Sequence, residues 1–185
     1  MVVYIHGFGS SGFSHKVTLL KEYMGKGEVF SPSLSYIPEL AIDTLDQMIS
    51  LLVKTENITL VGSSLGGYYA TYFSQKFDLK AVLINPSVYP YNSLAKQIGI
   101  NHSYHDSSDY GFIQAHIDSL KKYEVKEINA KNFLVLLQTG DEVLDFNQAR
   151  QKYEDSTLHI EEGGNHSFEN FESKMEMIKA FSLSA

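Results

Sequence analysis

Gly62-Ser63-Ser64-Leu65-Gly66 connects a short apolar run, Leu60-Val61, to a segment in which apolar residues recur at helical spacing. The five residues match G-x-S-x-G, a pattern in which a serine occupies a tight turn between a strand and a helix. Such a turn strains the backbone of its central residue, and the two glycines leave room for chains that pass close by. The pattern therefore predicts that Ser64, rather than Ser63, is exposed as a nucleophile.

Short β-rich runs alternate with longer helical segments on both sides of this turn, which is typical of βαβ units and a parallel sheet. We expect strands at residues 2–6, 29–30, 58–61, 79–84, 133–138 and 157–160. We expect helices at 14–24, from Pro38 to 53, at 65–77, 146–153 and 168–181. Right-handed crossovers then put helices on both faces and bring the strand carboxyl ends to one rim, where ligands bind.

A serine hydroxyl needs a base to remove its proton and a carboxylate to orient that base. Asp141 follows the predicted strand 133–138 and is the preferred acid. Glu142 and Asp145 are weaker candidates, and Asp145 is also suited to cap the next helix.

The preferred base is His166, in the glycine-rich loop after the last predicted strand. The order serine, acid, histidine is that of the α/β-hydrolase fold, with each residue on a loop that leaves a strand. His159 lies inside a predicted strand. The remaining histidines precede the proposed acid, so the order argues against them: His6, His15, His102, His105 and His116.

Two backbone amides are expected to bind the negative oxygen that develops during acyl transfer. The Leu65 amide opens the helix after Ser64, where the helix dipole favours negative charge. The loop after the first strand supplies the other donor in this fold, which points to the Phe8 amide. His6 in that loop is expected to be structural, with its ring bonded to nearby backbone.

Composition excludes several other classes of function. The 185-residue chain has no cysteine, so disulfides, thiolate metal sites and cysteine nucleophiles are excluded. It has 22 acidic and 15 basic residues, with Arg150 as its single arginine, and nucleic-acid binding is not expected. No apolar run approaches the ~20 residues of a membrane span. The first residues lack a basic leader, so we expect a cytoplasmic protein.

Residues 87–129 interrupt the alternation and show no strand signal. We interpret them as a cap inserted into a single domain of residues 1–185, with Tyr104, Tyr110 and Phe112 lining an acyl pocket. A zinc site is the alternative, because imidazole and carboxylate both bind zinc. Irregular spacing and the lack of an H-E-x-x-H pattern favour the cap over that site, whose candidate ligands are His102, His105, Asp106, Asp109 and His116.

Several stretches together resemble the YqiA-like family of small bacterial esterases, which have an α/β-hydrolase fold. They are Tyr4-Ile5-His6-Gly7-Phe8, residues 61–71, Asn85-Pro86, residues 138–145 and residues 162–166. The resemblance implies an esterase that acts on acyl esters or acyl thioesters without a cofactor. It also implies that Ser64, Asp141 and His166 form the catalytic triad.

The sequence thus predicts an α/β-hydrolase fold of about six mostly parallel strands with helices on both faces and a cap insertion. The predicted activity is hydrolysis of small-molecule esters or thioesters through an acyl-enzyme, with no cofactor and no metal. An acyltransferase with the same triad is one alternative. A catalytically silent binding or scaffold protein is the other, although serine, acid and histidine are all present in order. The sequence leaves the oligomeric state open.

Overall fold

Six parallel strands form the central sheet of the computed structural model, which describes residues 1–184. Their order is β2-β1-β3-β4-β7-β8, and every neighbouring pair is parallel. The bounds of the strands are β1 Val2–Ile5, β2 Val29–Phe30, β3 Thr59–Ser63, β4 Lys80–Ile84, β7 Phe133–Gln138 and β8 Thr157–Glu161. The prediction of an α/β-hydrolase fold with a six-stranded parallel sheet is confirmed.

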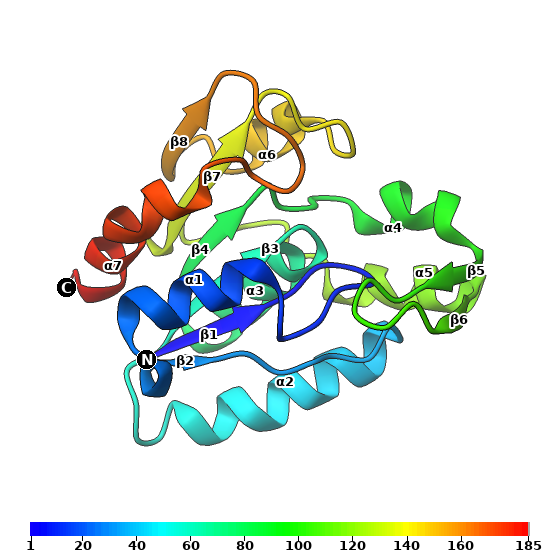
Figure 1. Cartoon of the computed structure of the whole chain (residues 1–185), viewed down its shortest axis with the longest axis horizontal. Helices are drawn as coiled ribbons and strands as arrows, with labels where there is room; N and C mark the ends of the chain where they lie inside the picture. Colours follow the sequence, from blue (N-terminus) through cyan, green and yellow to red (C-terminus); the bar gives the residue numbers. More distant parts are fainter. Residues whose placement is uncertain (185) are drawn as a thin grey trace.

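Helices cover both faces of this sheet, as Figure 1 shows. Their bounds are α1 His15–Met24, α2 Pro38–Leu52, α3 Leu65–Phe77, α4 Pro90–Ser93, α5 Gln114–Leu120, α6 Phe146–Lys152 and α7 Met175–Leu183. Short 3-10 turns occur at Lys26–Glu28, Leu94–Gln97, Lys121–Tyr123, Ala130–Asn132 and Phe171–Lys174. Helix α2 begins at Pro38, a residue whose fixed φ suits a first helical turn.

The alternation of side chains along the strands divides the core into two layers. One layer joins Val3, Ile5 and their equivalents on the other strands to α2, α3 and α6. The other joins Val2, Tyr4 and their equivalents to α1 and α7. The strands are apolar on both faces because both faces are covered.

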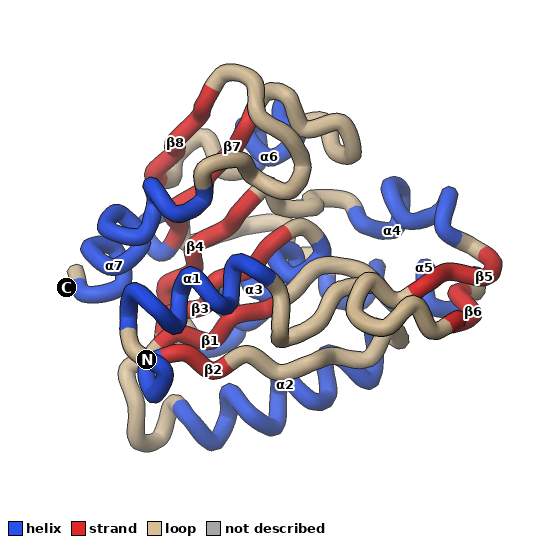
Figure 2. Tube along the Cα trace, in the orientation of Figure 1, coloured by secondary structure: helices blue, strands red, loops and turns tan. Residues whose placement is uncertain are grey.

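The carboxyl ends of the strands all reach the same end of the molecule because the strands are parallel. The loops that leave β1, β3, β4, β7 and β8 gather there, and both chain termini lie away from these loops (Figure 2). Any site built from these loops therefore combines residues that are far apart in the sequence.

Residues 87–129 contain strands that the sequence analysis did not predict. Strands β5 (Gly99–His102) and β6 (Asp109–Phe112) form an antiparallel hairpin outside the main sheet. Each is four residues long and mostly exposed, so the segment lacks the apolar alternation that marks a half-buried strand. The expectation that this segment has no strand is wrong for that reason.

The final helix begins later than the predicted Phe168. Helix α7 starts at Met175, after the 3-10 turn at Phe171–Lys174. Phe168 and Asn170 have φ values of 65° and 55°, which a right-handed helix cannot contain. Apolar spacing alone does not reveal such a backbone reversal.

Candidate active site

Ser64 occupies the turn between β3 and α3 with φ 55° and ψ −121°, a strained conformation for a residue with a side chain. Close packing explains the glycines on either side of it. A Cβ at Gly66 would overlap the Ile5 carbonyl oxygen, and a Cβ at Gly62 would overlap the Gly66 carbonyl oxygen. The local sequence thus forces the backbone to present Ser64 at the carboxyl end of the sheet.

His166 lies between Ser64 and Asp141. Its Nε2 is 3.0 Å from the Ser64 Oγ, and its Nδ1 is 2.8 Å from Asp141 Oδ2. The Asp141 side chain is 2% exposed and the His166 side chain 20%. The buried carboxylate can therefore orient a ring whose far edge remains open to a reactant.

The loop after β7 orients Asp141 through its own backbone. Asp141 Oδ1 accepts hydrogen bonds from the amides of Val143 at 2.9 Å and Leu144 at 2.8 Å. The other two acids considered from the sequence do not hydrogen-bond to the His166 ring and have other hydrogen-bond partners. Asp145 caps α6 by accepting from the Asn147 amide at 3.0 Å, as its position had suggested. Glu142 accepts from the His166 backbone amide at 2.9 Å, and this bond lowers the Glu142 pKa.

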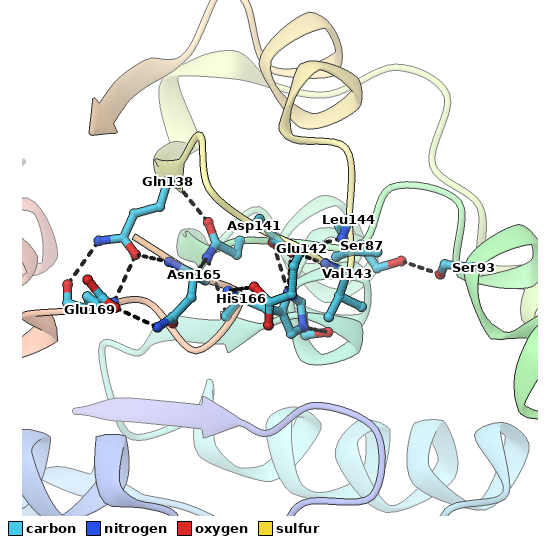
Figure 3. A network of polar contacts seen from close by, with 12 residues as sticks. Ser87, Ser93, Gln138, Asp141, Glu142, Val143, Leu144, Asn165, His166 and Glu169 are labelled. Atoms are coloured by element: carbon cyan, nitrogen blue, oxygen red, sulfur yellow. Dashed lines mark hydrogen bonds and ion pairs between the residues drawn. The ribbon is translucent and has the colours of Figure 1, made fainter. Parts of the chain in front are cut away.

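A network of amide side chains positions the loop that carries His166, and Figure 3 shows the part of it around Gln138. Asn85 Oδ1 accepts from the Gln138 amide at 3.0 Å, and Asn85 Nδ2 donates to the carbonyls of Asn165 at 2.9 Å and His166 at 3.3 Å. Gln138 Oε1 accepts from the amides of Asn165 at 3.1 Å and Glu169 at 2.8 Å. Two side chains thus connect the ends of β4 and β7 to the His166 loop.

The chain after β4 also contacts the nucleophile. The Ser64 amide donates to the Ile84 carbonyl at 3.1 Å, and the Ser87 amide donates to the Ser64 carbonyl at 3.0 Å. The segment from Ile84 to Ser87 therefore contacts the loops of Ser64 and His166 at once. Sequence reasoning did not assign a function to Asn85 itself. Its one local signal is the Asn85-Pro86 pair at the end of a predicted strand, with φ 39° at Asn85 in the structure.

The loop after β1 lies directly against Ser64. A Cβ at Gly7 would be 3.7 Å from the Ser64 Oγ, so the next amide, that of Phe8, lies close to the serine. Among the hydrogen bonds of residues 1–184, neither the Phe8 amide nor the Leu65 amide has a protein acceptor. Both amides are therefore available to a ligand beside Ser64.

His6 anchors this loop through its ring. The Leu34 amide donates to His6 Nε2 at 2.8 Å, and Nδ1 lies 2.8 Å from the Gly7 carbonyl oxygen. Burial lowers the His6 pKa, so the neutral ring can accept at one nitrogen and donate at the other. The expectation of a ring bonded to nearby backbone is confirmed.

The β5–β6 hairpin packs on the other side of the Phe8 loop. The Phe8 ring makes edge contacts with Phe112 and Tyr110, with centroids 4.9 Å and 5.8 Å away. The Tyr104 amide donates to the Gly9 carbonyl at 2.9 Å. Of the three aromatic residues expected at a pocket, Tyr104 and Tyr110 line cavities, whereas Phe112 is buried against Phe8.

Two cavities adjoin the site. One of about 610 Å³ is lined by Ser63, Ser64 and His166 among others. The other, of about 270 Å³, lies between the Phe8 loop and the hairpin and reaches Leu65. A larger hollow of about 810 Å³ lies at the amino-terminal ends of the strands, next to Thr59 and Lys80, and is remote from Ser64.

The potential zinc ligands of the hairpin region have separate partners. His102 pairs with Asp109 at 2.5 Å, His105 stacks on Phe13, and His116 packs against Phe112. Within residues 1–184, the structure contains no group of three potential metal-binding side chains. None of the helices in this range has the length and apolarity needed to cross a bilayer.

Comparison with known protein families identifies the family of this chain. The model of the uncharacterised protein family UPF0227 matches residues 1–183 of the chain. The chain belongs to UPF0227. UPF0227 protein YcfP from Salmonella gallinarum is 27% identical over 190 residues, and the alignment covers 98% of each chain. A UPF0227 protein from Citrobacter koseri is 27% identical over 187 residues, again with 98% of each chain covered. These findings support UPF0227, and they do not support the name YqiA.

Solved structures share the fold of this UPF0227 chain at low sequence identity. A putative hydrolase from Agrobacterium vitis S4 has a TM-score of 0.75 at 17% identity, covering 97% of this chain and 87% of that one. Est1E from Butyrivibrio proteoclasticus with bound ferulic acid has a TM-score of 0.73 at 13% identity, covering 98% and 87%. The esterase domain of a Rhodothermus marinus protein has a TM-score of 0.71 at 12% identity, covering 98% and 85%. The UPF0227 chain therefore has an α/β-hydrolase fold similar to that of esterases.

Proposed function

We propose that this protein is a serine hydrolase that cleaves small acyl esters or thioesters through an acyl-enzyme. The single observation that carries the proposal is the chain of contacts from Ser64 Oγ through His166 to the buried Asp141, at 3.0 Å and 2.8 Å. Such an arrangement activates a serine by giving its proton a base and that base a fixed orientation. The similarity in fold to esterases supports the same reaction class.

The proposed reaction begins when Ser64 Oγ attacks the carbonyl carbon and its proton passes to His166 Nε2. The amides of Phe8 and Leu65 donate to the resulting oxyanion, and Asp141 stabilises the imidazolium. His166 then returns the proton to the departing alcohol or thiol, which leaves an acyl-Ser64. A water molecule then gives one proton to His166 and attacks the acyl carbon. The bond from that carbon to Ser64 Oγ breaks as His166 returns the proton to Oγ, which releases the carboxylic acid and restores the free serine.

Two other functions remain as competing proposals. An alcohol that replaces water in the second step would make the protein an acyltransferase. A binding protein on the same fold would not need an activated serine, and the contacts from Ser64 through His166 to Asp141 argue against it. We further propose a single domain of residues 1–185 with a cap at about 87–129, which acts on its substrate in the cytoplasm.

Labelling with a fluorophosphonate tests the proposal, because this reagent reacts with activated serines. Intact mass should show one adduct on the natural chain and none on Ser64→Ala. Ser63→Ala is the matched control, because Ser63 is adjacent and lines the same cavity. It should still be labelled. A natural chain that folds but takes no adduct and hydrolyses no ester would contradict the proposal and favour a binding protein.

A further inference from the structure

The two cavities beside Ser64 differ in which parts of the site they contain. Ser64 and His166 line the cavity of about 610 Å³ and are not among the residues lining the smaller one. Leu65 lines the cavity of about 270 Å³, and Phe8 lines both. The nucleophile and base therefore face one cavity, while the other borders Phe8 and Leu65, the two residues whose amides are the proposed oxyanion donors.

Proton transfer restricts where each part of an ester can lie. The tetrahedral intermediate carries Ser64 Oγ, the oxyanion, the leaving group and the acyl substituent on one carbon. His166 Nε2 protonates the leaving group and must be within hydrogen-bond reach of it. The leaving group therefore lies in the larger cavity, on the His166 side. With the oxyanion at the Phe8 and Leu65 amides and the leaving group beside His166, the smaller cavity is the remaining space next to Phe8 and Leu65 for the acyl substituent.

We propose that the smaller cavity, between the Phe8 loop and the β5–β6 hairpin, binds the acyl group of the substrate, and that the larger cavity binds the alcohol or thiol. This inference rests on the proposed function and extends it to substrate class. A volume of about 270 Å³ is just below the usual range of ligand pockets, so this cavity has room for an acyl chain but limits its length. Tyr36 closes one side of this cavity, where it stacks on Tyr110 with ring centroids 4.6 Å apart.

The charge around the smaller cavity disfavours acyl groups that carry a carboxylate of their own. Asp106 and Asp109 line it, the latter paired with His102 at 2.5 Å, and neither lysine nor arginine is among the lining residues that the structure describes. Hydrogen bonds from the Ser108 hydroxyl and amide lower the Asp106 pKa to about 2, so this carboxylate is ionised at neutral pH. His6 is kept neutral by burial. The acyl group that fits is therefore uncharged, because a second carboxylate would face like charge.

Two ester series distinguish the two cavities. One varies acyl length on p-nitrophenol, and the other varies alcohol length on acetate. Tyr36→Ala, which opens the smaller cavity, should shift the acyl optimum to longer chains, with each added methylene gaining about fourfold in kcat/KM. The alcohol series should not shift. Val143→Ala is the matched control, because Val143 lines the larger cavity and is 59% exposed. It should alter the alcohol series alone.

The reverse pattern, or no shift in either series for a folded Tyr36→Ala that still takes the fluorophosphonate, would overturn the assignment of the cavities and leave the hydrolase intact. A natural chain without label or ester hydrolysis would overturn both. Circular dichroism of each variant establishes folding.

A charge comparison gives a second measurement. Ethyl butanoate and monoethyl succinate have four-carbon acyl groups and the same alcohol, and differ by one carboxylate. Butanoate should be preferred by about tenfold or more in kcat/KM at pH 8, where like charge meets the succinate. Asp106→Asn combined with Asp109→Asn should narrow the gap. Equal rates for the two esters, or a gap unchanged in that variant, would contradict an acyl group bound beside these aspartates.

Discussion

The His166 loop and the Phe8 loop face the same serine but are positioned by different kinds of contact. Buried amides, above all Asn85 and Gln138 at 3% exposure each, connect the His166 loop to the sheet. The buried His6 ring holds the start of the Phe8 loop, but beyond it the contacts are one hydrogen bond from the Tyr104 amide and the aromatic rings of a hairpin. That hairpin exposes Tyr104 by 86% and Ile100 by 70%. Hydrogen bonds are directional and costly to break when buried, whereas aromatic contacts tolerate small shifts. The His166 loop, which we call the stiff side of the site, is therefore held more rigidly. The Phe8 loop with its hairpin, the soft side, is better suited to vary with substrate.

The largest effect should come from the stiff side, at the acid. Asp141→Asn should reduce kcat by about 10⁴, because the amide no longer stabilises the imidazolium or selects its tautomer. Steady-state hydrolysis of a p-nitrophenyl ester measures this change, and the melting temperature reports folding. Asp145→Asn, at the cap of α6, is the control and should retain activity. Full activity in Asp141→Asn would transfer the role of acid to another carboxylate.

Asn85→Leu should break the network that positions His166. It leaves the Gln138 amide and the carbonyls of Asn165 and His166 without their partner, which should lower the unfolding free energy by about 3 kcal/mol. Turnover should fall by about 10² because His166 is displaced from Ser64. Urea denaturation and kinetics measure the two effects. Asn101→Leu removes a less buried amide from the hairpin, one that donates to the Gln97 carbonyl, and should cost less than about 1 kcal/mol. Similar losses in both variants would remove the distinction between the two regions.

Gly9→Ala should disturb the soft side without disrupting His166. Gly9 has φ 68°, and a Cβ there would lie 3.1 Å from the Tyr110 hydroxyl and 3.2 Å from the Tyr104 ring. We expect kcat to fall about tenfold with little change in KM, because displacement of the Phe8 amide weakens one oxyanion contact. Gly99→Ala is a matched control, with φ 128° and no atom within 4 Å of its Cβ. Its φ is also positive and is less favourable for alanine than that of Gly9, yet the change should leave kcat unchanged. An equal loss of kcat there would contradict a specific role for the Phe8 loop.

The smallest effect should be a pH dependence of stability on the stiff side. Lys174, and then Gln138, lower the Glu161 pKa from 4.5 to about 2. A carboxylate with a lowered pKa stabilises the fold above its unfolded pKa, and this contribution is lost as pH falls toward 2. The natural chain should therefore be more stable than Glu161→Gln at pH 7, with the difference shrinking between pH 4.5 and 2. Glu162→Gln, at the exposed neighbouring position, is the control, and thermal melts across this range measure both. A constant difference would contradict the coupling to Lys174.

Much of the fold was predictable because its signals are local. Glycine spacing around Ser64 and the alternation of apolar runs identified the turn, the six main strands and most helices. The function of Asn85 was not predicted because it depends on partners in other loops, among them Asn165, which is 80 residues away in the sequence. The β5–β6 hairpin was not predicted because it is exposed and because its principal packing partner is Phe8, which lies in the loop after β1.

The sequence by itself determined the type of fold, the position of Ser64 and the order of the candidate residues along the chain. It narrowed the acid to Asp141, Glu142 and Asp145 without separating them by geometry. The folded chain brings Asp141 to His166 Nδ1, uses Asp145 as a helix cap, and turns Glu142 toward a backbone amide. It also separates the two cavities on either side of Phe8. The reason is physical: strand, turn and helix preferences act between neighbours in the chain, whereas the Ser64–His166 contact joins residues 102 positions apart and depends on the order of strands in the sheet.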